Sequence, residues 1–309
     1  MKRGHKLFLV VTVTAVLMVC SAARLHASDA EGSFDRVLKV TGPVDLDVVT
    51  GSGNIKVSQG GAGTVRVVGH IKVHDGWDSK DAESKAHALE TNPPIEQNGN
   101  TVRIGHIDNS ELRHNVSISY EVEVPADTRL RAQTGSGNET ITGISGPLNL
   151  NTGSGNIAVM GGAEVRANTG SGDLQLESIN GEVRANTGSG NIRIEKSSLT
   201  DVKLSTGSGD VSASGVRGAL HVETGSGDIR VEGTQTADWK LEAGSGAISV
   251  RLPSDAAFDF YAHTGSGRID TEHPITMTGS LGRHELRGKV RGGGPLLQAR
   301  TGSGNISIQ

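Results

Sequence analysis

Apolar and polar residues alternate along most of this 309-residue chain, in short runs separated by glycine-rich turns. Val44, Leu46 and Val48 form one such run, and Ile55 and Val57 form the next. Alternate side chains of a strand face the same side of a sheet, so this pattern predicts short strands with one buried face. The expected fold class is therefore all-β.

The tetrapeptide Thr-Gly-Ser-Gly recurs at nearly regular intervals between these runs. Its copies begin at Thr50, Thr134, Thr152, Thr169, Thr187, Thr206, Thr224, Thr264 and Thr301, with a degenerate copy at Ala243. From Thr134 to Thr264 the copies follow one another after 17 to 21 residues. A unit of this size cannot bury an apolar face alone, so the repeat predicts stacked coils. We expect a single-domain β-solenoid, or β-helix, with coils of about 18 residues.

Stacking these repeats aligns their apolar positions in two columns. One column contains Leu148, Val165, Val183, Val202 and Leu220, and the other contains Ile157, Leu174, Ile192, Val211 and Ile229. Within each strand these residues share one parity, so both columns are expected to face a single continuous interior.

Each Thr-Gly-Ser-Gly copy is predicted to form a corner between two strands. The glycines are expected to supply positive φ, and the threonines to stack as a ladder along the solenoid. The Asn or Asp after most corners is expected to form an outward polar column. The predicted corner glycines are Gly51, Gly53, Gly135, Gly137, Gly153, Gly155, Gly170, Gly172, Gly188, Gly190, Gly207, Gly209, Gly225, Gly227, Gly265, Gly267, Gly302 and Gly304.

Residues 78–91 break the alternating pattern and predict one short helix. Ala82, Ala86 and Leu89 recur at helical spacing, and prolines end the segment. We expect this helix to flank or cap the strand stack. Residues 95–104 predict a hairpin about Asn98-Gly99. The expected solenoid domain, residues 28–309, thus has an N-terminal part (28–133), regular repeats (134–232) and irregular C-terminal coils (233–309).

Aromatic residues gather after the regular repeats, at Trp239, Phe258, Phe260 and Tyr261. They are predicted to cap the interior, and a ligand-binding aromatic surface is the alternative. The step of 37 residues from Thr264 to Thr301 is interpreted as two periods with one corner lost. The last strand is expected at or near an end of the solenoid.

Residues 1–27 have the order of a secretory signal peptide. Basic residues come first, an apolar run follows, and small residues allow cleavage after Ala23 or Ala27. A lipoprotein signal ending at Cys20 is the alternative, which the bulky Val19 disfavours. We expect an exported protein located in the periplasm or at the cell surface, with secretion as a further alternative.

The chain that remains after removal of this signal is acidic and has no cysteine. Four of the 30 basic residues lie in the signal, so 26 remain against 34 acidic residues, a net charge of −8. Without a basic cluster, nucleic acid is not expected as a partner. No later segment is long and apolar enough to predict a transmembrane helix.

The glycine-rich corners do not match nucleotide-binding or hydrolase motifs. No corner continues into Gly-Lys-Ser or Gly-Lys-Thr, and near-identical corners cannot each hold a catalytic triad. Calcium-binding β-rolls also have coils of about 18 residues, but here Asn often replaces the Asp that those sites need.

Other candidate chemistry is weaker still. His70 and His74 lie on one predicted strand, where this spacing holds them too far apart to share a zinc ion. Asp255, Asp259, Asp270 and Glu272 are interpreted as surface acids and not as a glycosidase pair. We predict no catalytic residue, no metal site and no cofactor.

The chain resembles the bacterial "putative adhesin" domain family of unknown function. The resemblance rests on Tyr120–Pro125, on the repeats from Thr134 to Val231, on Val250–Pro253 and on the segment from Gly292 to Ile306. It implies a β-solenoid of the cell envelope without catalytic activity, and it supplies no binding residues.

These observations predict an exported structural or binding module, adhesin-like, with a protein or glycan of the cell envelope as its partner. One alternative is a β-helical carbohydrate-active enzyme, although the short regular turns leave little room for a substrate cleft. Another is a periplasmic sensor or regulatory partner in envelope stress. If a function is localised, we expect it where the repeat fails: at the helix from Trp77, in the aromatic-rich stretch from Trp239 to Tyr261, or in the glycine-rich return before Thr301.

Overall fold

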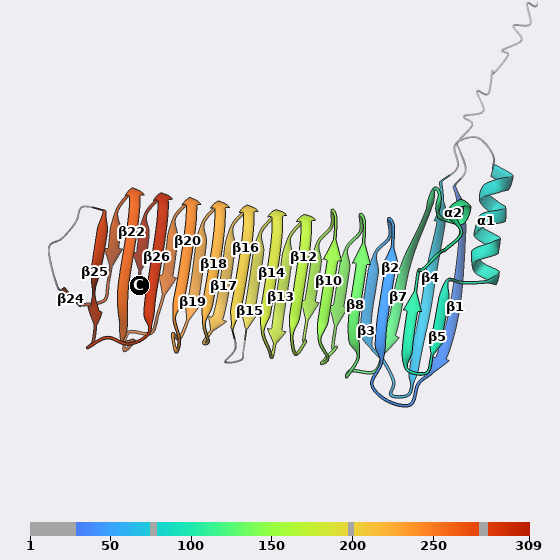
Figure 1. Cartoon of the computed structure of the whole chain (residues 1–309), viewed down its shortest axis with the longest axis horizontal. Coiled ribbons are helices and arrows are strands. Elements are labelled where there is room, and N and C mark those ends of the chain that lie inside the picture. The colour runs from blue at the N-terminus through green and yellow to red at the C-terminus, as the bar shows by residue number, and fades with distance from the viewer. Residues whose placement is uncertain (1–28, 75–78, 197–200, 278–283) are drawn as a thin grey trace, which may run out of the picture.

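A computed structural model describes residues 29–74, 79–196, 201–277 and 284–309. The expected signal segment, with Cys20, lies outside these residues. Within them the chain forms two long sheets that run side by side along one elongated body (Figure 1). The architecture is the predicted β-solenoid.

Sheet A contains, in spatial order, β1 (Ala30–Lys39), β4 (Thr64–Val73), β7 (Val116–Val124), β3 (Ile55–Gln59), β9 (Glu139–Thr142), β11 (Ile157–Met160), β13 (Leu174–Ile179), β15 (Ile192–Lys196), β17 (Val211–Val216), β19 (Ile229–Gly233), β21 (Ile248–Arg251), β27 (Ile306–Ile308) and β23 (Ile269–Thr271).

Sheet B contains, in spatial order, β24 (Ile275–Met277), β25 (Glu285–Val290), β22 (Phe258–Ser266), β26 (Leu296–Ser303), β20 (Trp239–Ser245), β18 (Leu220–Ser226), β16 (Val202–Ser208), β14 (Val183–Ser189), β12 (Val165–Ser171), β10 (Leu148–Thr152), β8 (Arg129–Thr134), β2 (Asp45–Thr50), β6 (Thr101–Ile104) and β5 (Ile95–Asn98).

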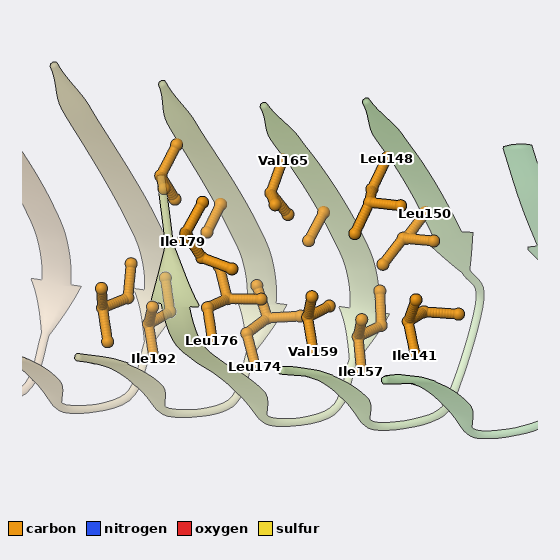
Figure 2. Close-up of a cluster of buried hydrophobic side chains, with 14 of the residues drawn as sticks. Ile141, Leu148, Leu150, Ile157, Val159, Val165, Leu174, Leu176, Ile179 and Ile192 are labelled. Atoms are coloured by element: carbon orange, nitrogen blue, oxygen red, sulfur yellow. The ribbon is translucent and has the colours of Figure 1, made fainter. Parts of the chain in front are cut away.

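Each regular coil consists of one strand of sheet B, a Thr-Gly-Ser-Gly corner and one strand of sheet A. Neighbouring coils pair in parallel, so that Leu148 lies beside Val165 and Val165 beside Val183. In sheet A, Ile157 pairs with Leu174 and Leu174 with Ile192. Both predicted columns are confirmed, and their side chains fill the space between the two sheets (Figure 2).

The corner glycines are needed because neighbouring corners are stacked too closely for a side chain. A Cβ atom on Gly137 would lie less than 3.0 Å from the carbonyl oxygen of Gly53, and one on Gly135 would meet the carbonyl oxygen of Gly51 in the same way. The same conflict recurs at the later corners.

The prediction that these corners require positive φ is wrong for most of them. Among the corner glycines, φ is positive only at the second glycine of five corners, where it lies between 145° and 158°, close to extended backbone. These five are Gly209, Gly227, Gly246, Gly267 and Gly304.

The corner threonines bond to the backbone of the neighbouring coil and not to one another. Thr187 Oγ1 donates a hydrogen bond of 3.0 Å to the carbonyl oxygen of Gly172, and Thr206 Oγ1 donates one of 3.0 Å to that of Gly190. The threonines are buried, so each bond satisfies a polar group away from water. The expected threonine column exists, but its hydrogen bonds run from side chain to backbone.

The Asn or Asp after most corners forms a second ladder. The N–H of Asn191 donates to Asp173 Oδ1 at 2.8 Å, and the N–H of Asp210 donates to Asn191 Oδ1 at 2.9 Å. Only an acceptor oxygen is required, and both residue types supply one. This explains why both Asn and Asp occur in the column.

The coils do not follow chain order at either end of the solenoid. β26 pairs with both β20 and β22, and β27 pairs with both β21 and β23, so the last coil is inserted one place before the end. In the same way β2 lies between β6 and β8. The last strand does lie near an end, as predicted. The 37-residue step, however, is an excursion through β23, β24 and β25 and not two successive periods.

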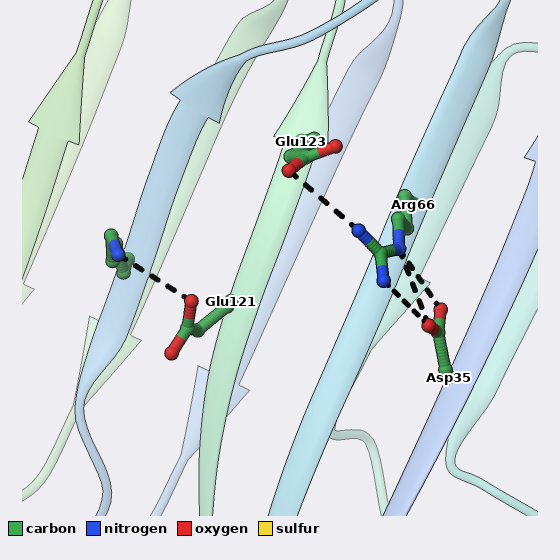
Figure 3. A network of polar contacts seen from close by, with 5 residues as sticks. Asp35, Arg66, Glu121 and Glu123 are labelled. Carbon is green, nitrogen blue, oxygen red and sulfur yellow. Dashed lines mark hydrogen bonds and ion pairs between the residues drawn. The ribbon is translucent and has the colours of Figure 1, made fainter.

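Antiparallel strands close the N-terminal end of sheet A. β4 pairs antiparallel with both β1 and β7, and Arg66 of β4 contacts Asp35 at 2.8 Å and Glu123 at 3.9 Å (Figure 3). The Arg66 guanidinium holds the pKa of the Asp35 carboxyl below its ordinary value. At this end the chain thus changes from the parallel pairing of the coils to antiparallel pairing, and β7 joins the two because it pairs parallel with β3.

Helix α1 (Ser79–Thr91) covers this end and is the predicted helix. Its buried residues are Ala82, Ala86 and Leu89, the three that carried the helical spacing. A second short helix, α2 (Ser110–Arg113), was not predicted. The predicted hairpin is formed by β5 and β6, but its turn residues are Gly99 and Asn100.

One acidic residue interrupts the inward apolar columns. Glu139 pairs with Ile55 on one side and Ile157 on the other, and it is fully buried. Among the described residues, neither of its carboxyl oxygens has a hydrogen-bond partner. Burial raises the pKa of Glu139 to about 8, so the side chain is mostly protonated at neutral pH.

Corner stacking predicts opposite results for two glycines with the same sequence context. A Cβ added to Gly51 would have no atom within 4 Å, so Gly51→Ala should change the free energy of unfolding by less than about 1 kcal/mol. Gly135→Ala meets the Gly51 carbonyl and should cost about 1–3 kcal/mol or more. Urea denaturation measures both, and equal losses would contradict the stacking explanation.

The threonine ladder predicts one destabilising and one stabilising substitution. Thr187→Val keeps the shape but leaves the Gly172 carbonyl without its donor, which should cost about 1–3 kcal/mol. Ala243→Thr adds a hydroxyl in a column where Thr224 and Thr301 are its neighbours, and it should gain about 0.5–1.5 kcal/mol. Denaturation midpoints test both, and a destabilised Ala243→Thr variant would count against the ladder.

The burial of Glu139 predicts that the free energy of unfolding falls as pH rises. The folded carboxyl has a pKa of about 8 against 4.5 for an unperturbed one, so the unfolded state releases its proton first. The contribution of the protonated carboxyl to the free energy of unfolding is complete below pH 4.5, and it is lost between pH 4.5 and about pH 8. Glu139→Gln should flatten the decline measured by urea denaturation at several pH values. The exposed Glu232→Gln should leave the decline unchanged, and equal profiles for the two variants would refute the role of Glu139.

Candidate functional site

Most of the aromatic side chains lie inside the solenoid. Trp239, Phe258 and Phe260 are buried in the interior, and the Trp239 indole N–H donates to the carbonyl oxygen of Gly218 at 2.9 Å. Phe258 packs edge-on against Phe260 and His273 near the C-terminal end of the core. Trp239 lies farther inside, because its strand is flanked by strands on both sides.

Tyr261 is the one of these four residues that reaches the outside. It is half-buried on the outer face of sheet B, where the guanidinium carbons of Arg287 and Arg300 lie 4.5 and 5.1 Å from its ring centroid. Cations at this distance are attracted to the ring. The chain's own arginines thus occupy the place that a stacking ligand would need.

The dispersed histidines and acids are not brought together. His70 contacts Glu121 at 3.8 Å, whereas His74 contacts Asp29 at 3.2 Å. Asp259 contacts Lys289 and accepts a hydrogen bond from the Gly294 N–H. Within the described residues, no three His, Cys, Asp or Glu side chains are grouped as a metal site.

The outer faces of the regular coils carry charges that pair within single strands. Arg166 contacts Glu164 at 2.8 Å, and Arg184 contacts Glu182 at 2.7 Å. Beside them, Asn168 donates to Asn151 and Asn186 donates to Asn168 along the stack. These pairs make the face polar and locally neutral.

A cavity lies at the N-terminal end, where no Thr-Gly-Ser-Gly corner is stacked on the first one. The coil formed by β6 and β7 replaces the corner with an eleven-residue connection that contains α2. This connection passes beside the corner of residues 50–53 and leaves a cavity of about 470 Å³. The volume lies in the range of small-molecule binding sites, about 300–1,000 Å³.

The cavity has an apolar wall and a polar rim. Ile107, Val116 and Ile118 contribute apolar surface, and Gly51 contributes backbone. His106, Asp108 and Arg113 are exposed residues of the rim. The site therefore combines aliphatic contact with hydrogen-bonding and charged groups, which is the usual composition of a ligand-binding cavity.

Two polar side chains at the cavity, His106 and Tyr120, are held by contacts within the protein. His106 Nε2 lies 3.4 Å from Asp47 Oδ2 on the neighbouring strand β2. Tyr120 is buried at the base of the cavity, and burial raises the pKa of its hydroxyl above the ordinary value. The Tyr120 hydroxyl therefore stays protonated at neutral pH.

The arrangement lacks the parts of a nucleophilic site. His106 and Asp47 resemble a base with its orienting carboxylate, but no described hydroxyl or thiol is hydrogen-bonded to His106. The nearest corner hydroxyl, Thr50 Oγ1, donates to the carbonyl oxygen of Ile118 at 2.7 Å.

The sequence reasoning missed this cavity, although one signal was available. Each regular strand of sheet B continues into Thr-Gly-Ser-Gly or its degenerate copy, but the strand ending at Ile104 continues into a longer segment without that tetrapeptide. A missing corner in a stack leaves its neighbour uncovered. The repeat does fail at this position, but the cavity lies at none of the three places that the sequence indicated.

A family model described as Toastrack DUF4097 matches residues 31–309. The chain belongs to this family. The match covers both the regular coils and the two closed ends, so the Toastrack assignment applies to the whole solenoid. No curated protein matches the chain.

Three solved structures are similar at low identity. A putative cell adhesion protein from Clostridium sporogenes shares 13% identity at a TM-score of 0.30, covering 90% of this chain and 99% of its own. A putative adhesin from Bacteroides fragilis shares 14% sequence identity at a TM-score of 0.38, and the match covers 90% of this chain and 97% of that one. A putative lipid binding protein from Parabacteroides distasonis shares 14% sequence identity at a TM-score of 0.41, and the match covers 90% of this chain and 97% of that one.

In the described part of this Toastrack chain, no helix is both long and apolar enough to cross a membrane.

Proposed function

We propose that this protein is an exported, non-catalytic binding module of the cell envelope and that the N-terminal cavity is its binding site. The observation that carries the proposal is the open first corner, where the apolar interior, free backbone groups and charged side chains meet in one cavity. The signal-like segment at residues 1–27 supports export.

The rest of the solenoid supports this assignment by its regularity. The interior is filled with stacked aliphatic side chains, and several of the outer charges of the regular coils are paired, as in Arg166–Glu164 and Arg184–Glu182. The solenoid then serves as a rigid spacer that presents its N-terminal end. A β-helical enzyme would need a cleft with unpaired acids, and Asp259, one of the candidate acids, is already bonded to Lys289.

A site-directed crosslinking experiment tests this proposal. The full chain is produced in its native cell with a photoreactive residue at Asp108, on the cavity rim, or at Gln175, on the outer face of sheet A. We expect the chain in the envelope fraction and a defined crosslinked product from position 108 only. The Gln175 chain is the matched control because its photoreactive residue is equally exposed but far from the cavity.

Two results would contradict the proposal. Equal crosslinking from both positions would show that the cavity is not the binding site. Recovery of the chain in the cytosol would show that it is not exported. Turnover of a polysaccharide by the purified protein would instead favour the carbohydrate-active alternative. A membrane protein in the crosslinked product would favour the alternative of a periplasmic sensor or regulatory partner.

A further inference from the structure

The first glycine and the serine of a corner each carry a backbone N–H group. In the second and third corners these N–H groups donate hydrogen bonds to the preceding corner. In the second corner, the N–H of Gly135 donates to Thr50 O at 3.2 Å, and the N–H of Ser136 donates to Gly51 O at 3.2 Å. The third corner repeats this, with Gly153 and Ser154 bonded to the second corner. Within each corner these N–H groups point toward the coil on the N-terminal side.

At the first corner, among the described residues, the N–H groups of Gly51 and Ser52 have no acceptor. Strand β7 contacts other groups of this corner, since Thr50 Oγ1 donates to the carbonyl oxygen of Ile118 and Ser117 Oγ donates to that of Ser52. A Cβ added to Gly51 would meet nothing within 4 Å, so the space in front of this residue is open. The hydrogen-bond ladder therefore ends in two free donors, and Gly51, which carries one of them, lines the cavity.

A free cation lies on the rim of the same cavity. In the described part of the chain, the Arg113 side chain makes no ion pair and no hydrogen bond, and it is exposed. The other charged rim residue, Asp108, likewise has no partner there. His106 is held by Asp47. Two N–H donors and a guanidinium together favour an anionic acceptor over a cation.

The remaining wall of the cavity is aliphatic. Ile107 and Val116 are half-buried and Ile118 is buried, so they offer apolar surface without a polar partner of their own. A ligand that fills this wall must be apolar over most of its length, because an unpaired polar group buried there would lose its hydration.

We propose that the cavity binds a carboxylate attached to an apolar body. The carboxylate accepts from Gly51 and Ser52 and pairs with Arg113, and the apolar body packs on Ile107, Val116 and Ile118. Two sources carry this chemistry: a free medium-chain carboxylic acid, and the C-terminus of a polypeptide that ends in an apolar residue. The inference rests on the proposed binding function and names its ligand class.

Calorimetric titration of the purified full chain tests the carboxylate and the apolar body separately. Octanoate represents the free acid, and octanol is its neutral control. Acetyl-Ala-Ala-Leu with a free C-terminus represents the polypeptide, and its C-terminal amide is the control. We expect at least one carboxylate to bind about tenfold or more tightly than its neutral control. If the free acid binds, affinity should rise about fourfold per methylene from hexanoate to octanoate.

Three variants assign the binding to this site. Arg113→Gln should weaken binding of the carboxylate about tenfold, because it removes the charge and keeps a similar length. Asp108→Asn, on the same rim, should not weaken it, since it removes a repulsive charge. Arg268→Gln, an exposed arginine near the opposite end of the solenoid, should leave the affinity unchanged.

The outcomes separate the two sources and the two proposals. Binding of octanoate alone identifies a free acid, and binding of the peptide alone identifies a polypeptide C-terminus. Equal affinity for charged and neutral probes, no binding of either carboxylate, or an unaffected Arg113→Gln variant would overturn the inference. If crosslinking from position 108 still captures an envelope partner in that case, the proposed function stands and only the carboxylate chemistry is refuted.

Discussion

The close stacking of the corners is the constraint on which the rest of the solenoid depends. The backbone of one corner lies so near the next that a Cβ atom on Gly137 would meet the Gly53 carbonyl at less than 3.0 Å. This approach places each threonine hydroxyl within reach of a carbonyl oxygen in the neighbouring coil, and each Asn or Asp oxygen within reach of an N–H. The strands then pair in register, and the aliphatic columns follow from that register.

The same constraint explains why the ends differ from the middle. A stack of identical corners always leaves one unsatisfied face at each end, and exposed strand edges promote association with other chains. Here antiparallel strands close three of the four sheet edges in the described residues, and the last coil is inserted between two earlier ones. The first corner remains open, and the cavity lies there. The candidate site of this protein thus lies at the N-terminal end of the stack of Thr-Gly-Ser-Gly corners.

The sequence predicts the repeating part of this structure well because the repeat acts locally. Val183, Ala185 and Thr187 share a parity, and the spacing of the corners places each beside its counterpart in the next coil. The order of the end coils is not predictable in this way. The corner at Thr301 has the same sequence as the others, so nothing in it shows that its neighbours are Ala243 and Thr264.

The site was not predictable for a related reason. Gly51 and Gly135 have the same neighbours in sequence, yet one faces open space and the other faces a carbonyl group. The difference arises from which segment occupies the next position in the stack. The buried Glu139 could have been found, because it directly follows Asn138 at a position where other coils have Ile, Leu or Val. Large rings rarely remain exposed on an otherwise aliphatic fold, and Trp239 and Phe258 are buried. The sequence does not show that Trp239 lies within a column, between Leu220 and Leu297.

Native-state hydrogen exchange at the corner amides measures the central constraint directly. If stacked corners hold the coils together, the N–H groups of Asn191 and Asp210 should exchange as slowly as those of the adjoining strands, because each is bonded to a side-chain oxygen of the neighbouring coil. The N–H groups of Gly51 and Ser52 should exchange rapidly. Rapid exchange at every corner, with protection confined to the strands, would show that the corners merely connect the strands and would contradict this explanation of the fold.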